Sequence, residues 1–387
     1  MKRSVYDDDH ESFRAVIREF VAKEVAPHFA KWEAAGQVPR ELFRALGALG
    51  VTGFGIPEEY GGPGEVGYKY QAIIAEEAAS AAVILGHYTV STGIVLPYLL
   101  KLATDEQKRR WLPGVATGEI VLCIAMTEPG TGSDLAGIRT TATRSGDGGH
   151  YLLNGAKTFI TGARNSELCV VAVRTAPPTE TDRRAGLSLL VVDTATPGFE
   201  IGRSLNKIGM HASDTSELTF TDVRVPVENL LGEPGRGFAQ LGANLPRERL
   251  AIGVEATARA QAAIGFALDY TRARAIYGRP VAAFQNTKFV LAECDTEVSA
   301  AWALVDQGLE LEERGELTAA DAARIKLFCT EVAGRVIDKC LQLHGGYGYI
   351  TEYPIARLYA DTRVNRIYGG TSEVMKSIIA KDLGLAP

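Results

Sequence analysis

The chain has 387 residues, which is long enough to bury a large core and to form two or three domains. Its hydrophobic fraction of 46%, charged fraction of 23% and net charge of −6 are those of an ordinary globular protein. Acidic and basic residues are interspersed rather than grouped in blocks. This pattern argues against a binding surface for nucleic acid or for an anionic membrane.

The cysteines and the apolar runs indicate the cellular setting. The five cysteines are scattered and form no Cys-x-x-Cys pair, so neither a zinc site nor a disulfide framework is expected. The chain begins with two basic residues followed at once by acidic ones, unlike a signal or transit peptide. The apolar stretch 90–102 contains Thr92, Gly93 and Pro97 and is too short to span a bilayer. We therefore expect a cytoplasmic protein without a membrane span.

The first region, residues 1–118, is predicted to be helical. Apolar residues recur at three- and four-residue spacing between Phe13 and Val25, which gives one apolar stripe on a helix. A Pro- and Gly-rich loop separates this helix from an alanine-rich helix expected near residues 68–86. Residues 104–107 have the spacing of a capping box and predict the start of another helix.

Residues 119–232 have a different sequence pattern, with short β-rich runs separated by turn residues. Strands and helices do not alternate regularly here, so a parallel dinucleotide-binding sheet is not expected. We predict a small antiparallel sandwich or barrel, with strands at 121–126, 151–154, 169–173, 187–193 and 216–220.

Residues 233–387 return to a helical period and predict a bundle of four or five helices. The helical stretches are 249–276, 281–314, 317–345 and 371–383. The first of them carries a stripe of mostly small residues that permits close helix packing, namely Ile252, Ala256, Ala260, Ala263, Ala267 and Tyr270. The order helical, β, helical predicts an α+β fold with domains 1–118, 119–232 and 233–387.

Two segments of the β region contain residue types suited to a flat polar ligand. Segment 125–134 has glycines and short hydroxyl residues that could present backbone N–H groups to a ligand, although a plain glycine-rich turn explains it more simply. In segment 154–161, strand alternation places Phe159 and Thr161 on one face, where a heterocycle could stack. An ordinary β face with one core aromatic is again the simpler explanation.

Three segments of the C-terminal region are similarly ambiguous. The glycines of 342–352 could accept a diphosphate or merely end a helix, and segment 368–373 could be a simple N-cap. His344 is expected to be a structural hydrogen-bonding residue. Segment 245–250 places Pro246 and Glu248 where a helix would start, because proline suits the first turn and a carboxylate favours the positive end of the helix dipole. That structural role alone would explain Glu248.

Taken together and in this order, the segments resemble the acyl-CoA dehydrogenase family over essentially the whole chain. The matching segments are 57–62, 126–134, 207–210, 225–232 and 342–361. The resemblance implies a helical, β-barrel, helical fold that binds FAD as a homotetramer, a dimer of dimers. Thr131 stands where a smaller residue is usual in the family.

The resemblance also assigns residues to FAD. It places Phe159 against the isoalloxazine ring, where some relatives have tryptophan, and Thr161 near flavin N5. The other implied FAD contacts are Met126, Thr127, Gly132 and Ser133 around the ring and the pyrophosphate side, Arg274, Tyr277 and Gln285 at the diphosphate and adenosine, Gln342 and Gly346 from a neighbouring subunit, and Thr371 and Glu373 as the last contacts.

The family divides over the position of its catalytic glutamate. Many members carry it immediately before the Gly-Thr of the final loop, where this chain has Gly369. A minority, similar to the long-chain and isovaleryl dehydrogenases, carry it at the start of a helix in the C-terminal bundle, and Glu248 matches that position. The backbone N–H of Gly369 and a flavin ribityl hydroxyl are the implied donors to the enolate oxygen. Arg249 is implied to support the active-site loop, and the implied substrate contacts are Ser133, Arg249, Tyr368 and Gly370.

The resemblance implies α,β-desaturation of an acyl-CoA to the trans-2-enoyl-CoA in β-oxidation, with electrons passed to an electron-transfer flavoprotein. Tyr368 beside Gly369 favours straight medium or long acyl chains, although Gly369 leaves room for branched ones. The alternatives are a biosynthetic dehydrogenase of carrier-protein-bound or branched thioesters, an oxidase, and a flavin-binding protein without catalysis. The presence of Glu248 argues against the last of these.

Overall fold

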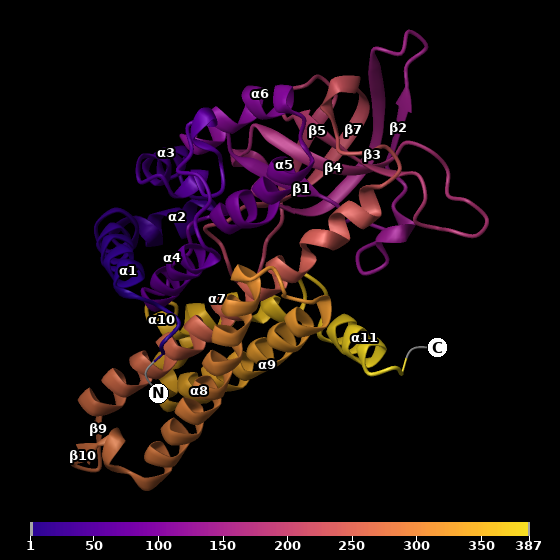
Figure 1. Ribbon diagram of the computed structural model, residues 1–387. Coiled ribbons are helices and arrows are strands. Elements are labelled where there is room, and N and C mark those ends of the chain that lie inside the picture. Colours follow the sequence, from indigo (N-terminus) through magenta and orange to yellow (C-terminus); the bar gives the residue numbers. More distant parts are fainter. Residues whose placement is uncertain (1–2, 386–387) are drawn as a thin grey trace.

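The computed structural model describes residues 3–385, which form three consecutive regions (Figure 1). Helices come first, a β-sheet region follows, and a second set of helices closes the chain. The predicted α+β class is therefore confirmed. None of the helices in residues 3–385 is both long enough and apolar enough to cross a membrane.

The N-terminal region is built from short helices. The capping box predicted at residues 104–107 is present, since Thr104 Oγ1 accepts the Gln107 N–H at 3.2 Å and Gln107 Oε1 accepts the Thr104 N–H at 2.9 Å. One helix ends at Ser80 rather than near residue 86, because the chain turns through a positive φ at Ala82. The helices are α1 (Asp8–Phe20), α2 (Phe29–Ala35), α3 (Arg40–Ala48), α4 (Tyr68–Ser80), α5 (Leu96–Leu102) and α6 (Asp105–Ala116), with π-helical segments at Val21–Val25 and Thr89–Val95.

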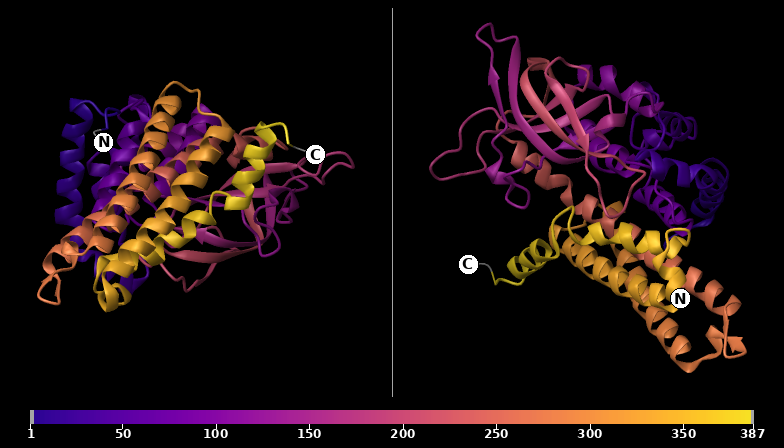
Figure 2. Two further views of the ribbon diagram at one scale, coloured as in Figure 1. Left: turned by 90° about the horizontal axis from the view of Figure 1, so that it is seen from below. Right: turned by 180° about the vertical axis from the view of Figure 1, so that it is seen from behind.

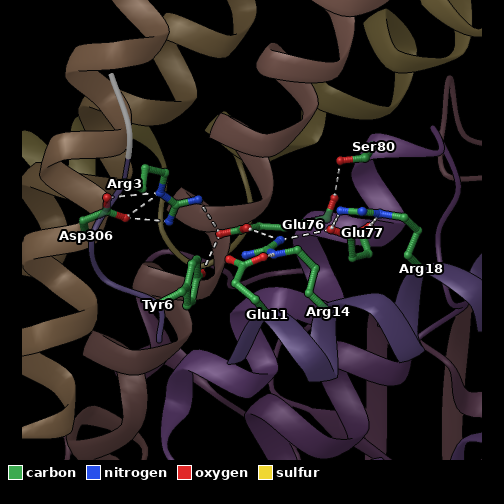
Figure 3. A network of polar contacts seen from close by, with 9 residues as sticks. All are labelled: Arg3, Tyr6, Glu11, Arg14, Arg18, Glu76, Glu77, Ser80 and Asp306. Atoms are coloured by element: carbon green, nitrogen blue, oxygen red, sulfur yellow. Dashed lines mark hydrogen bonds and ion pairs between the residues drawn. The ribbon is translucent and has the colours of Figure 1, made fainter. Parts of the chain in front are cut away.

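A cluster of charges ties α1 and α4 to the C-terminal bundle (Figure 3). Arg14 on α1 contacts the buried Glu76 and Glu77 of α4 at 2.8 and 3.0 Å. Arg3 contacts Glu76 at 2.8 Å and reaches Asp306 on α8 (Gln285–Glu313) at 2.5 Å. Each of the two buried carboxylates therefore has a guanidinium partner, which the burial of a charge requires.

Replacement of Arg14 by methionine is expected to lower the free energy of unfolding by roughly 1.5–3 kcal/mol, because it removes a cation shared by two buried carboxylates while Arg3 and Arg18 remain on them. Arg18, whose side chain is 65% exposed, contacts Glu77 at 2.9 Å and provides the matched control. Arg18→Met is expected to cost less than about 1 kcal/mol. Urea unfolding of the two variants measures the difference, and equal losses would show that the cluster is not held by Arg14.

The middle region forms one eight-stranded sheet in the order β6-β7-β3-β2-β4-β5-β8, with β1 paired to β4. Most neighbours are antiparallel, as predicted, but β1 and β2 both pair with β4 in parallel. The five predicted runs fall on β1, β3, β4, β5 and β7, whereas β2, β6 and β8 are short or mostly polar and gave no apolar run. The strands are β1 (Leu122–Ala125), β2 (Thr141–Arg144), β3 (His150–Thr161), β4 (Leu168–Arg174), β5 (Leu187–Asp193), β6 (Phe199–Ser204), β7 (Thr215–Pro226) and β8 (Leu230–Leu231).

Strand β4 is buried on both faces, and its two faces belong to different cores. Leu168 and Val170 pack with residues of α5 and α6, whereas Cys169 and Val171 pack with residues of β3 and β7. The first of these cores also includes Leu241. The sheet therefore lies against the N-terminal helices and the start of the next long helix.

The C-terminal region is a helical bundle organised around α7 (Gly237–Ala273), a helix of 37 residues (Figures 1 and 2). The small residues of the predicted stripe are buried in the bundle core. The helix starts at Gly237, well before the predicted start near residue 249, so Pro246 lies inside it. Pro246 cannot donate to the carbonyl of Gly242, but Gly242 is exposed and water can serve that carbonyl. Packed with α7 are α8, α9 (Ala319–Leu343) and α10 (Pro354–Thr362), which was not predicted, whereas α11 (Ser372–Asp382) packs on α9.

Candidate active site

Glu248 lies inside α7, about three turns from its start. Its side chain is buried, with the residue only 4% exposed. Glu248 Oε1 accepts hydrogen bonds from the Tyr98 hydroxyl at 2.9 Å and from Asn244 Nδ2 at 3.3 Å. Tyr98 belongs to α5, and Asn244 stands one turn earlier on α7. The carboxylate is thus held by two neutral donors from different regions of the chain.

This environment makes Glu248 an unusual acid. Burial raises the pKa of Glu248 to about 7, and the hydrogen bonds from Tyr98 and Asn244 and the charge of Arg249 offset that effect only in part. A carboxylate with such a pKa is matched to proton abstraction near neutral pH. The expectation that Glu248 begins a helix is wrong, because its position three turns inside α7 is outside the N-terminal turn where the helix dipole acts.

The loop before α11 is fixed by two cations. Gly369 and Gly370 have φ values of +64° and +101°. Arg249 Nε donates to the Gly369 carbonyl at 3.2 Å, and Lys326 Nζ of α9 donates to the Gly370 carbonyl. Within residues 3–385, the Gly369 N–H donates to no group, so it remains available to a ligand. Burial, aided by the charge of Arg249, lowers the pKa of Lys326 to about 8.

Position 369 is unfavourable for a residue with a side chain. A Cβ atom built on Gly369 lies 2.5 Å from Cδ1 of Ile252, and its positive φ is strained for any other residue. Ile252 stands one turn after Glu248 on α7. The helix that carries Glu248 therefore also narrows the space at the alternative position for a carboxylate.

The other predicted substrate contacts lie around these groups or on the β region. Tyr368 is half-buried, and its hydroxyl donates to Asn365 Oδ1 at 2.8 Å. Gly370 belongs to the loop fixed by Lys326, and Ser133 is exposed on the segment between β1 and β2.

A buried ion pair shapes the segment that follows β1. Lys157 Nζ on β3 lies 2.9 Å from Glu128 Oε1 and donates to the Met126 carbonyl at 3.0 Å. Glu128 also accepts the N–H groups of Arg139 at 2.7 Å and Thr140 at 2.9 Å. Burial lowers the pKa of Lys157 to about 8, although the charge of Glu128 opposes this. The pair anchors the backbone at Met126 and so positions the residues after it.

Phe159 forms an exposed aromatic surface beside that segment. It is 66% exposed, and the neighbouring Thr158 N–H donates to the Thr127 carbonyl at 2.9 Å. Phe159 has a φ of +59°, and the register of β3 against β7 shifts between Lys157 and Ile160. The alternation used to place Phe159 and Thr161 on one face is therefore interrupted. An exposed ring next to the hydroxyl and backbone groups of 127–133 suits a flat polar heterocycle.

The remaining predicted cofactor residues lie elsewhere. Arg274, Tyr277 and Gln285 surround the hairpin of β9 (Ala275–Ile276) and β10 (Arg279–Pro280), at the tip of the bundle and far from β3 (Figure 1). Arg274 lies 5.8 Å from the ring centre of Tyr347, so this tip meets the segment containing Gln342 and Gly346. Thr371 caps α11, as its Oγ1 accepts the Val374 N–H at 3.3 Å, and Glu373 is in the first turn of that helix.

Sequence reasoning missed three residues of this site. Asn244 is one helical turn from Glu248, a signal that is readable only once the helix is known to begin at Gly237. Tyr98 and Lys326 reach the site from α5 and α9, and no local pattern marks them. His344, expected to be structural, is so: its Nδ1 lies 2.8 Å from the Cys340 carbonyl. In residues 3–385 no group of three His, Cys, Asp or Glu side chains is arranged to hold a metal ion.

Comparison with known proteins assigns the family. Family models match the chain in order: acyl-CoA dehydrogenase N-terminal domain at residues 7–119, middle domain at 123–223 and C-terminal domain at 235–384. The chain belongs to the acyl-CoA dehydrogenase family. Long-chain specific acyl-CoA dehydrogenase, mitochondrial, of Sus scrofa is 40% identical over 98% of this chain and 88% of its own length.

Solved structures agree with this acyl-CoA dehydrogenase assignment. The crystal structure of acyl-CoA dehydrogenase from Geobacillus kaustophilus has a TM-score of 0.95 and 42% identity, covering 99% of this chain and all (100%) of that one. The acyl-CoA dehydrogenase of Bacillus anthracis, complexed with FAD, has a TM-score of 0.91 and 30% identity, covering 99% and 68%. The protein is an oxidoreductase that acts on a CH–CH group with FAD as cofactor, which would accept a hydride when bound. Exposed Phe159 and segment 127–133 fit the flavin part of this group.

Glu248→Gln is expected to stabilise the protein at alkaline pH. The pKa of Glu248 is raised from 4.5 to about 7, so the native state loses stability as the pH rises between these values and the buried carboxyl ionises. The loss corresponds to roughly 3 kcal/mol above pH 7, and glutamine does not incur it. Urea unfolding should show a gain for the variant at pH 8 that shrinks to about 1 kcal/mol or less at pH 5. An equal gain at both values would contradict the raised pKa.

Proposed function

We propose that this acyl-CoA dehydrogenase desaturates a straight medium or long acyl-CoA to the trans-2-enoyl-CoA, with Glu248 as the base. The observation that carries the proposal is the buried Glu248 carboxylate next to a loop whose Gly369 N–H is free. Arg249 follows Glu248 in sequence and donates to the Gly369 carbonyl, and Ile252 contacts the same glycine. Base and hydrogen-bond donor are thus positioned by one helix.

The chemistry requires both groups. The α-proton of a thioester is weakly acidic, so the base must be poised by desolvation, as Glu248 is. Removal of that proton puts negative charge on the thioester oxygen, and the Gly369 N–H can donate to it. Because Arg249 and Lys326 fix the carbonyls of the glycine pair, the donor does not have to reorganise during the reaction.

Glu248→Gln is expected to leave FAD bound and to abolish the substrate-dependent bleaching of the flavin, because the amide cannot accept the α-proton. Anaerobic mixing with an acyl-CoA panel measures the bleaching, and the visible spectrum before mixing measures bound FAD. Bleaching by the variant at the wild-type rate would overturn the assignment of the base.

The wild-type rate of bleaching should depend on pH through Glu248. Its carboxyl is neutral below its pKa of about 7 and ionised above it, and only the ionised form accepts a proton. The rate should therefore fall about tenfold per unit below pH 7 and level off above it. Stopped-flow measurement across pH 5 to 9 tests this, and a flat profile would contradict it.

We propose that the acyl chain runs from Glu248 towards a small cavity. It lies between α4, the segment Thr89–Val95 and α7, and its lining includes small residues such as Ala75, Gly93 and Ala251. Among the residues of α7 that line the cavity, Glu255 is the farthest from Glu248. It lies seven residues, or about 10 Å, further along the helix. The cavity has a volume of about 20 Å³, little more than one water requires, so an acyl chain would enter it only by displacing the side chains that line it.

Narrowing this cavity should shorten the acyl chain that the enzyme accepts. Gly93→Leu is expected to lower kcat/KM for palmitoyl-CoA by roughly 10–200-fold while affecting butyryl-CoA much less, because only the long chain needs the space. Gly265→Leu, at a helical position with open space around it, is the control. Equal effects on both substrates would show that the chain does not use this cavity.

The assembly and the partners are proposed on a similar basis. Residues assigned to FAD lie at two distant ends of one chain, and Tyr277 at the bundle tip is 94% exposed. This supports a homotetramer, a dimer of dimers, in which a neighbouring subunit completes each FAD site. We further propose the domains 1–118, 119–232 and 233–387, a cytoplasmic location, a role in β-oxidation and an electron-transfer flavoprotein as acceptor. Peroxide production would instead indicate an oxidase, and preference for carrier-linked acyl groups a biosynthetic role.

A further inference from the structure

A second cavity lies on the other side of the Glu248 hydrogen bonds. It has a volume of about 320 Å³, is partly open to solvent and is situated between α5 and the first turns of α7. Tyr98 and Asn244, which both donate to Glu248 Oε1, are among its lining residues. The groups that hold the base therefore form part of the wall of a cavity that reaches the surface.

The lining of this cavity is suited to water. The side-chain oxygens Asn244 Oδ1 and Gln240 Oε1 are buried and have no hydrogen-bond partner in residues 3–385, and both residues line the cavity. Buried polar atoms of this kind are usually satisfied by ordered water. The volume far exceeds the roughly 10–15 Å³ that one water requires. Charged residues, among them Lys101, complete the lining and are exposed.

The proposed function creates a need for such a path. Glu248 gains one proton in each turnover and is buried, and the proposed course of the acyl chain is on the α4 side of α7. We propose that the cavity between α5 and α7 is the route by which the proton taken by Glu248 reaches solvent, through the Tyr98 hydroxyl and water. This inference rests on the proposed function, because it assumes that Glu248 is the base.

The transfer balances without any further reactant. The α-carbon–hydrogen bond breaks and the proton forms an O–H bond on Glu248. That proton then passes to the Tyr98 oxygen while the original Tyr98 hydroxyl proton passes to a water in the cavity and onward to solvent. Tyr98 and the Glu248 carboxylate are both restored. Burial raises the pKa of Tyr98, which keeps its hydroxyl neutral between transfers, and the Asn244 amide positions the carboxylate without ionising.

The experiment compares two rates in one anaerobic mixture of the holoenzyme and acyl-CoA in D2O. Flavin bleaching reports the removal of the α-proton. Mass spectrometry measures deuterium at C2 of the recovered acyl-CoA, which reports exit of that proton to solvent followed by the reverse reaction. A chase with labelled enoyl-CoA measures product dissociation, so that only exchange within the complex is counted. The ratio of deuterium incorporation to bleaching is compared among variants.

Ala243→Phe fills the cavity from an exposed lining position and does not alter the groups that bind Glu248. Bleaching should stay within about twofold of wild type, and the ratio should fall at least about tenfold, equivalent to about 1.4 kcal/mol. Ala243→Ser keeps the cavity open and should match wild type. Ala239→Leu fills the same cavity from a second position and should repeat the effect. Tyr98→Phe should also lower the ratio, because it removes the hydroxyl that relays the proton.

The outcomes separate this inference from the proposed function. A wild-type ratio in a cavity-filling variant that still bleaches would overturn the route, and a wild-type ratio in Tyr98→Phe would overturn the role of the hydroxyl. If Glu248→Gln bleaches normally, the base is another residue and the proposed function fails instead.

Discussion

The burial of the Glu248 carboxylate on α7 is the constraint around which the site is arranged. A carboxylate removed from water is costly unless hydrogen bonds or charges compensate it. Here two neutral donors, Tyr98 and Asn244, compensate only one oxygen, and the pKa stays raised. The helix that bears this carboxylate also carries Arg249 and Ile252, which place the glycine loop. A change in the position of α7 would therefore disturb the base and the donor together.

The surface assigned to the cofactor is stabilised differently from the base. The surface beside Phe159 depends on a fully paired charge, Lys157 with Glu128, whose hydrogen bonds hold the backbone of Met126 and residues 139–140. Such a pair fixes geometry because both partners have their hydrogen-bonding capacity largely satisfied. Full pairing of the charges suits the cofactor side, which requires a rigid scaffold. Partial pairing suits Glu248, which must remain a reactive acid.

The order of helical and β regions was predictable from the sequence, because hydrophobic period and turn residues report local structure directly. The start of α7 was not, since Pro246 has the local signature of a first turn and only its tertiary surroundings keep the helix intact. The pair of Gly369 and Glu248 was recognisable by resemblance, whereas Tyr98 and Lys326 approach from α5 and α9 without any local sign. The interruption at Phe159 was missed because a register shift leaves no trace in an alternating pattern.

The charged cluster around Glu76 and Glu77 has a mechanical consequence for the cavity between α4 and α7. The face of α4 that includes Ala72 and Ala75 is one wall of that cavity, and α7 is another. Arg3 links α4 to α8, and α8 packs on α7, so both walls belong to one stiff body. The third wall is the π-helical segment Thr89–Val95, which the charged cluster does not contact. A ligand larger than this cavity would therefore be accommodated more readily by displacement of this segment than by separation of α4 from α7.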